Sequence, residues 1–187
     1  MKAARLLAAA AACLVLDAAA FDVGSLFAML ARERPPRAQF AEKKYMALLD
    51  KPLEASGELA FTPPHTIEKR TLKPRPERVV VDRERVTLER GGKTHTLSLR
   101  EHPQVAVLVE SIRATLAGDL DALSRTYSVG LEGDERSWRL RMRPLDPALT
   151  ALVDRIEIAG SGALVKVVEI HQSDGDRSVM TLAPVAR

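Results

Sequence analysis

Apolar side chains recur at helical spacing in two segments of the chain. Between Asp22 and the Pro35-Pro36 pair they occupy Val23, Leu26, Phe27 and Leu30. This spacing is typical of one face of an amphipathic helix, which Asp22 can cap and the prolines must end near residue 34. A second stripe follows Pro103 and comprises Val105, Leu108, Val109, Ile112 and Leu116. We predict a longer helix there, ended by Gly118, and a short third helix capped by Asp119.

Much of the remaining chain alternates between apolar and polar residues, as expected of strands with one buried face. The clearest case is 137–144, where arginines alternate with Trp138, Leu140 and Met142. Gly91-Gly92 separates two short alternating segments and predicts a hairpin, because a type I′ turn needs positive φ at both positions. Besides a strand around Leu97, the pattern predicts strands over 39–49, 53–62, 66–73, 78–82, 85–90, 127–132, 137–144, 155–159, 164–172 and 177–182.

The order of these elements predicts the fold class. About ten or eleven short strands are preceded by one helix and interrupted by a helical pair, without strand–helix–strand alternation. We predict a mainly β, α+β fold in which an antiparallel sheet carries its helices on one side. Such a sheet either packs solidly against the helices or leaves an apolar cavity, and the periodicity does not distinguish the two.

The first twenty residues have the pattern of a cleavable export signal. Lys2 and Arg5 precede an apolar run over 6–16, and alanines occupy 18–20, where a signal peptidase reads small residues. About eleven apolar residues are too few to span a bilayer, which needs about 20. We expect a cut after Ala20, a single domain over 21–187 and a location in the periplasm. Cys13, the only cysteine, would leave with the signal.

Composition and charge exclude several function classes. The 28 basic and 25 acidic residues are interleaved, so the totals do not indicate a nucleic-acid surface. The aromatic share of 4% disfavours binders of single-stranded nucleic acid, which stack bases on aromatic rings. One cysteine excludes an internal disulfide framework, an iron–sulfur cluster and a cysteine-rich zinc site.

Catalytic and metal-binding patterns are missing from the sequence. None of the usual metal-binding spacings is formed by His65, His95, His102 and His171. Gly160-Ser161-Gly162 lacks the spacing of a hydrolase nucleophile turn and is interpreted as a hairpin turn. Asp174-Gly175-Asp176 lacks the further ligands of a calcium loop and is also interpreted as a turn. We therefore predict no enzyme activity, no metal and no cofactor.

Basic residues gather in the segment 69–78, which holds Lys69, Arg70, Lys73, Arg75 and Arg78. Glu68 and Glu77 interrupt the charge, and Pro74 and Pro76 indicate a loop. We interpret the segment as solvated. The alternative is contact with anionic headgroups or an acidic partner through Arg70, Lys73 and Arg75.

Five motifs, taken in order, resemble one protein family. They are RAQFAEKKY at 37–45, PLEASGELAFTPP at 52–64, GDLDAL at 118–123, SWRLRMRP at 137–144 and DGDRS at 174–178. Together they resemble the outer-membrane lipoprotein carrier family, LolA and its relatives, over nearly the whole chain after residue 20. The resemblance implies an incomplete antiparallel β-barrel whose concave apolar face is covered by helices.

The resemblance also implies a carrier that shelters acyl chains of lipoproteins or lipids between an inner-membrane exporter and an outer-membrane acceptor. An acyl chain of roughly 15 methylenes, at about 0.8 kcal/mol each, is held in its membrane by on the order of 12 kcal/mol and needs shelter to cross water. We expect a monomer without nucleic acid. The candidate lining residues are Leu26, Leu30, Leu108 and Ile112 from the helices, and Leu59, Phe61, Trp138, Leu140 and Met142 from the sheet.

Two departures from the general carriers leave alternatives open. Pro63 precedes Pro64 where those carriers have an arginine tied to lid closure, and we expect the chain to lack their C-terminal extension. A specialised lipid carrier with a dedicated exporter is therefore a rival to general lipoprotein transport. A further hypothesis is an envelope interaction module without lipid cargo, which would use the basic segment 69–78.

Overall fold

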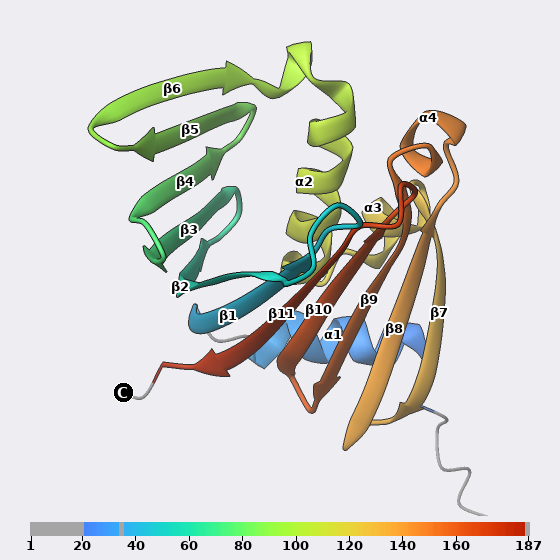
Figure 1. The fold of residues 1–187 in the computed structure, drawn as a ribbon. Helices are drawn as coiled ribbons and strands as arrows, with labels where there is room; N and C mark the ends of the chain where they lie inside the picture. The colour runs from blue at the N-terminus through green and yellow to red at the C-terminus, as the bar shows by residue number, and fades with distance from the viewer. Residues whose placement is uncertain (1–20, 34–35, 186–187) are drawn as a thin grey trace, which may run out of the picture.

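The computed structural model of the protein describes residues 21–33 and 36–185, without the side chains of Glu33, Gln104 and Leu108. The predicted export signal over 1–20 lies outside the described residues. The described chain forms one curved antiparallel sheet with helices on its concave side (Figure 1). Its strands are β1 (Arg37–Tyr45), β2 (Leu53–Thr62), β3 (Thr66–Lys73), β4 (Glu77–Asp82), β5 (Arg85–Arg90), β6 (Lys93–Ser98), β7 (Tyr127–Asp134), β8 (Ser137–Pro144), β9 (Val153–Ser161), β10 (Leu164–Gln172) and β11 (Arg177–Pro184).

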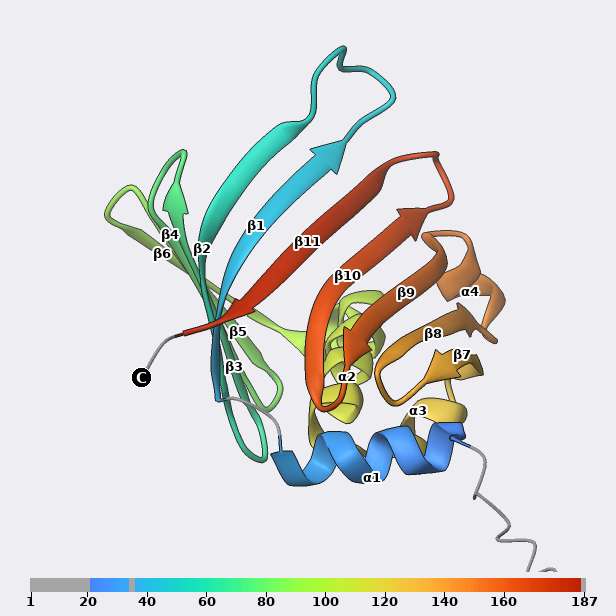
Figure 2. The same ribbon diagram turned by 90° about the horizontal axis from the view of Figure 1, so that it is seen from below.

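The sheet consists of two meanders joined in the middle. Its strand order is β6-β5-β4-β3-β2-β1-β11-β10-β9-β8-β7, so the first and last strands of the chain are neighbours. β6 and β7 are the two edges, and the sheet curves without closing (Figure 2). The predicted incomplete antiparallel barrel of ten to eleven strands is therefore confirmed.

The three predicted helices lie in their expected places, as α1 (Val23–Glu33), α2 (Pro103–Ala117) and α3 (Leu120–Ser124). The chain also forms a short helix α4 (Pro147–Thr150) and a 3-10 turn, η1 (Leu99–Glu101), before α2. Asp22 caps α1 by accepting a hydrogen bond of 2.7 Å from the Ser25 amide, and Asp119 caps α3. Gly118 ends α2 with φ 71°, a left-handed conformation that favours glycine.

The hairpin predicted at Gly91-Gly92 joins β5 to β6. The two glycines have φ values of 56° and 74°, so both central positions of the turn are left-handed, as predicted. The predicted turn at 174–176 likewise joins β10 to β11. The turn predicted at 160–162 lies slightly later, because Gly160 and Ser161 still pair with β10 and only Gly162 is in the β9–β10 turn.

Some element boundaries differ from the predicted ones. β1 ends at Tyr45 rather than 49, because the chain turns at Met46, whose carbonyl accepts a hydrogen bond from the Leu49 amide. The amide of Ala47 donates instead to Asp176 Oδ1 at the β10–β11 turn. β9 begins at Val153, earlier than predicted, because α4 ends at Thr150.

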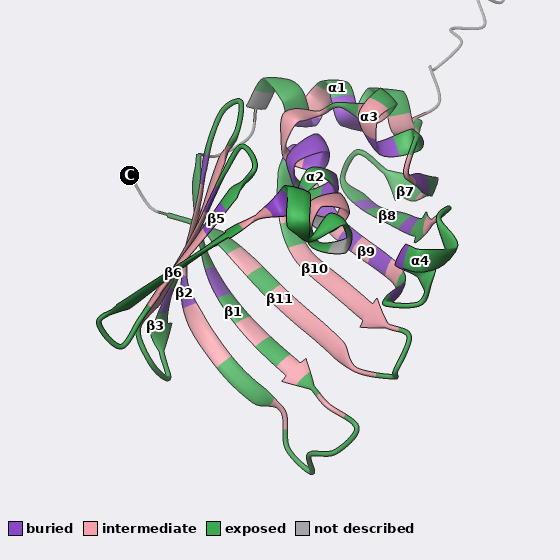
Figure 3. Ribbon diagram, turned by 90° about the horizontal axis from the view of Figure 1, so that it is seen from above, coloured by how far each residue is buried: buried purple, intermediate pink, exposed green. Residues whose placement is uncertain are grey.

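The concave face is identified by following cross-strand partners, which share a face of a sheet. Leu140 on β8 pairs with Ile158 on β9, and Ile158 pairs with Val168 on β10. Val168 pairs with Met180 on β11, and Met180 with Glu42 on β1. The buried face of β8 therefore continues across the middle of the sheet, on the side where α1, α2 and α3 lie (Figure 3).

The apolar core consists of two clusters on this concave side. The larger lies between α1, α2, α3 and the strands β7 to β10, and its fully buried residues include Leu26, Phe27, Leu123, Tyr127, Leu140 and Met142. The smaller joins β4 and β5 to η1 and α2 through Val81, Val86, Leu99 and Val109. The central strands β2, β1 and β11 lie between the two clusters.

Candidate functional site

The concave side of the central strands combines apolar and charged residues. Register places Phe40 opposite Leu182 and Glu42 opposite Met180 on this side. We call this region the central concave surface and define it by Phe40, Glu42, Lys44, Leu59, Lys69, Ser178, Met180 and Leu182. Only Phe40 among them is buried, and the other seven are partly exposed. The surface between the two core clusters is therefore open to a ligand.

Helix α2 adds an exposed apolar stripe beside this surface. With 3.6 residues per turn, Ala106 and Val109 share the side that packs on the smaller cluster, while Val107 packs on the larger. Val105 and Ile112 belong to neither cluster and are 44% and 41% exposed. Being seven residues apart, Val105 and Ile112 share a side of α2 that packs on neither cluster, and α2 itself lies on the concave side of the sheet (Figure 3).

A polar cluster lies in the middle of the central concave surface. Glu42 accepts hydrogen bonds from Lys69 Nζ at 2.5 Å and from the Ser178 hydroxyl at 2.7 Å. Lys69 Nζ also lies 4.9 Å from the centroid of the Phe40 ring, a cation–π distance. The side chains of Lys69 and Glu42 are only 30% and 18% exposed. This ion pair is therefore held rigidly and largely out of water.

Glu42 remains ionised in this setting. Burial acts to raise its pKa, but the hydrogen bonds from Lys69 and Ser178, with the positive charges of Lys69 and Lys44, outweigh burial and hold the pKa below its ordinary value. Lys44 is half-buried on the same face and, among the described residues, has no ion-pair partner. Glu42, Lys44 and Lys69 together carry one excess positive charge.

The predicted lining residues divide into two groups. Leu26, Leu30, Trp138, Leu140 and Met142 meet in the larger cluster, where each is at most 3% exposed. These five side chains pack against one another and their neighbours, so they belong to the closed core and leave no open surface for a ligand.

Of the other four predicted residues, the three whose side chains are described lie outside the larger cluster. Leu59 belongs to the central concave surface, and Phe61, on the same face of β2, is 6% exposed. Ile112 lies on the exposed stripe of α2. The side chain of Leu108 lies outside the described part of the structure, but its position on α2 is between those of Val105 and Ile112.

The basic segment 69–78 does not form one patch. Lys69 faces the concave side, whereas Arg70 and Arg78 both pair with Glu68 on the convex side, at 3.6 and 2.8 Å. Arg78 also pairs with Glu89 at 3.3 Å. Only Lys73 and Arg75, exposed at the β3–β4 turn, have no ion pair within the described chain.

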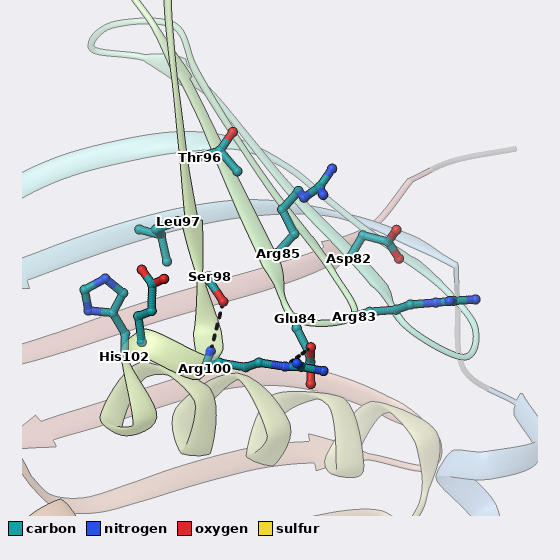
Figure 4. A pocket seen from close by; sticks show the side chains of 10 residues that line it. Asp82, Arg83, Glu84, Arg85, Thr96, Leu97, Ser98, Arg100 and His102 are labelled. Atoms are coloured by element: carbon teal, nitrogen blue, oxygen red, sulfur yellow. Dashed lines mark hydrogen bonds and ion pairs between the residues drawn. The ribbon is translucent and has the colours of Figure 1, made fainter.

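Two pockets lie away from the central concave surface. One, of about 920 Å³, lies where β4, β5 and β6 meet η1 (Figure 4) and is lined by Asp82, Arg83, Glu84, Arg85, Thr96, Leu97, Ser98, Arg100, Glu101 and His102. Its three arginines balance its three acidic residues, and Arg100 pairs with Glu84 at 2.5 Å. The other, of about 400 Å³, lies beside Trp138 and Lys166. Neither has the apolar lining that an acyl chain requires.

Sequence reasoning missed the polar cluster and Val105. Val105 was on the predicted apolar stripe of α2, but periodicity does not say which part of a stripe stays uncovered. Lys69 was grouped with the other basic residues of its segment, although strand alternation separates it from Arg70. Glu42 and Ser178 lie far apart in the chain, so only the pairing of β1 with β11 reveals their contact.

Two further findings concern the described residues alone. They contain no group of three or more His, Cys, Asp or Glu side chains placed to hold a metal ion. None of their helices is long and apolar enough to cross a membrane.

An incompletely closed antiparallel sheet with helices on its concave face is the fold that the sequence resemblance implied, and comparison with known families agrees. The family model described as outer membrane lipoprotein carrier protein LolA-like matches residues 15–187. The chain therefore belongs to the LolA-like family, as its motifs predicted.

Solved structures with a similar arrangement share little sequence with this chain. A LolA superfamily protein from Nitrosomonas europaea is 11% identical, with 88% of this chain and 92% of that one covered and a TM-score of 0.44. The lipoprotein LppX from Mycobacterium tuberculosis is 10% identical over 87% and 97%, with a TM-score of 0.43. In the MucA/MucB complex from Pseudomonas aeruginosa, the matched chain is 15% identical over 88% and 59%, with a TM-score of 0.45. Comparison with curated proteins gave no match.

Proposed function

We propose that this protein is a periplasmic carrier that holds acyl chains of lipoproteins or lipids against its concave side and ferries them from the inner to the outer membrane. Membership of the LolA-like family supports the carrier class. The observation that carries the proposal is the exposure of Val105 and Ile112, 44% and 41%, on a side of α2 that packs on neither core cluster, although α2 lies on the concave side of the sheet. An acyl chain lying there would cover both.

The energetics of a carrier favour such an open surface. Each buried methylene contributes about 0.8 kcal/mol, so a site that covers most of an acyl chain offsets most of the cost of leaving the membrane. A site that covered the chain completely would hinder its release to an acceptor. A cargo chain lying on the central concave surface, beside the solid cluster around Leu140, would stay partly accessible for transfer.

Binding of a fluorescent hexadecanoyl probe to purified, delipidated protein tests the proposal. The variant Ile112→Asp places a charge on the exposed stripe and should weaken binding about tenfold or more, since burial of an isoleucine contributes roughly 1.5–3 kcal/mol. The matched control is Leu164→Asp, a similarly exposed leucine (39%) at the β9–β10 turn, which should bind as the wild type does.

Two results would count against the carrier. One is equal binding by the Ile112→Asp and Leu164→Asp variants. The other is the recovery of protein from the periplasm with no extractable lipid, together with no binding of the probe in vitro. Circular dichroism of both variants checks that any loss of binding is not a loss of fold.

The alternative of an interaction module without lipid is less well supported. It relied on the combined charge of the segment 69–78, and ion pairs to Glu42, Glu68 and Glu89 neutralise much of that charge. Only Lys73 and Arg75 remain at the turn for an acidic partner.

A further inference from the structure

Polarity changes along the central concave surface from one end of its strands to the other. Along β1, Lys44 and Glu42 precede Phe40 on the concave face, and along β11 the matching residues are Ser178, Met180 and Leu182. At about 3.3 Å per residue, the charged end and the aromatic end of this stretch of β1 are about 13 Å apart. In Figure 3, β1 runs away from α1, so the charged residues near the end of β1 lie at the end of the strand that is far from this helix. The surface therefore has a charged end and an apolar end, which match the headgroup and the acyl chain of an amphiphile.

The charged end carries an excess positive charge. Glu42 is fully engaged, because Lys69 and Ser178 donate to its two oxygens. Lys69 still has donor capacity, since an ammonium has three N–H groups and Glu42 takes one. Among the described residues, Lys44 forms no ion pair and acts on Glu42 only at longer range, yet it is half-buried. A half-buried cation beside a satisfied ion pair is a position that an anion stabilises.

We propose that the cargo is an amphiphile with an anionic headgroup, a carboxylate or a phosphate group, bound by Lys44 and Lys69 while its acyl chain lies over Met180 and Leu182 toward α2. This inference rests on the proposed function and narrows its substrate class. Glu42 is a positioning residue in this arrangement: it holds Lys69 in place and limits the net charge of the site to one.

Displacement of the bound fluorescent probe by three competitors of equal chain length tests the headgroup. The competitors are palmitate, hexadecyl phosphate and hexadecanol, each below its micelle concentration. Wild-type protein should prefer at least one of the two anions to the neutral alcohol by about fivefold, the effect expected of one well-placed ion pair. The comparison of palmitate with hexadecyl phosphate shows which anionic group the site fits.

The adjacent lysines of β1 provide a matched pair of variants. Lys44→Gln should reduce the preference for the anion to about one. Lys43→Gln should leave it unchanged, because Lys43 is on the convex face, where it pairs with Glu54 at 3.1 Å. Glu42→Gln raises the net charge of the site and should strengthen the preference, an effect that mere damage to the fold would not produce.

The outcomes separate this inference from the proposed function. If all three competitors displace the probe equally, or if Lys43→Gln acts as Lys44→Gln does, the proposed headgroup site is contradicted, whereas the proposed acyl-carrier function is not. If the probe does not bind wild-type protein at all, the carrier and the headgroup site both fail.

Discussion

The indole ring of Trp138 lies against Gly160, its cross-strand partner on β9. A Cβ atom at Gly160 would lie only 2.3 Å from Cζ2 of the ring. The indole Nε1 also donates a hydrogen bond of 2.8 Å to the Gly162 carbonyl, at the turn that follows. The only tryptophan of the chain is thus buried because its neighbouring strand leaves room for it.

Substitution of Gly160 should therefore destabilise the protein. We expect Gly160→Ala to lower the free energy of unfolding by about 1–3 kcal/mol, since the added methyl group overlaps both the ring and the backbone oxygen of Leu164. Gly130→Ala on β7 is the control, because no atom lies within 4 Å of the added Cβ there. Urea unfolding of the two variants measures the difference, and similar midpoints would contradict the overlap.

The larger core cluster should be sensitive to truncation of Leu140. Its side chain is fully buried, so Leu140→Ala should lower the free energy of unfolding by about 2–5 kcal/mol through lost burial and a residual cavity. Leu164→Ala, at an exposed position, should cost less than about 1 kcal/mol. Chemical denaturation distinguishes the two; a small loss for Leu140→Ala would show that the cluster is loosely packed.

Stability should fall in acid, partly through Glu157 on the convex face. Burial acts to raise the pKa of Glu157, but hydrogen bonds from Arg155 at 3.0 Å and Arg139 at 2.9 Å outweigh it and lower the pKa. A lowered pKa in the folded state stabilises the protein above the ordinary value of about 4.3. This contribution is lost as pH falls through the folded-state value.

The variant Glu157→Gln tests this contribution. It cannot ionise, so its free energy of unfolding should fall less steeply than that of the wild type between pH 6 and pH 3. Urea unfolding at several pH values measures both slopes. Parallel curves for the two proteins would rule out Glu157 as a source of acid sensitivity.

The short helix α3 should depend on its cap. Asp119 Oδ1 accepts a hydrogen bond of 2.9 Å from the Ala122 amide, and the helix has only five residues. We expect Asp119→Ala to cost about 0.5–2 kcal/mol and Asp119→Asn to cost less, because asparagine is also a good cap. Asp121→Ala, inside the same helix, is the control. Thermal unfolding that ranks the three differently would contradict a capping role.

The sequence was sufficient to predict the sheet and its helices because local chemistry determines them. Gly91-Gly92 required a two-residue turn, Gly118 ended a helix, and the alternation around Trp138 identified a buried face. Boundaries were less accurate where contacts between distant segments decide them. The end of β1 is an example, since the Ala47 amide bonds to Asp176, which is far away in sequence.

The candidate site was harder to predict than the fold. An apolar position on a strand or helix indicates the inward side, but it does not tell whether another element covers that side. Leu140 and Ile112 both fit the pattern of lining residues, yet one is fully buried and the other is 41% exposed. The polar cluster depends on the register of β1 with β2 and β11, which no local pattern encodes.

The pairing of β1 with β11 has a consequence for folding. Each meander joins strands that are close in sequence, so each can form from local contacts. The ladder from Ala38–Pro184 to Tyr45–Arg177, in contrast, joins the first and last strands of the sheet's sequence order. Closure of so long a loop carries a large entropic cost and slows folding. The residues of the proposed cargo site lie on both sides of this seam, with Lys44 and Lys69 on one side and Met180 and Leu182 on the other. A folding intermediate in which both meanders have formed but β1 has not yet paired with β11 would therefore be unable to bind cargo. During refolding, the recovery of binding would mark the formation of this long-range pairing.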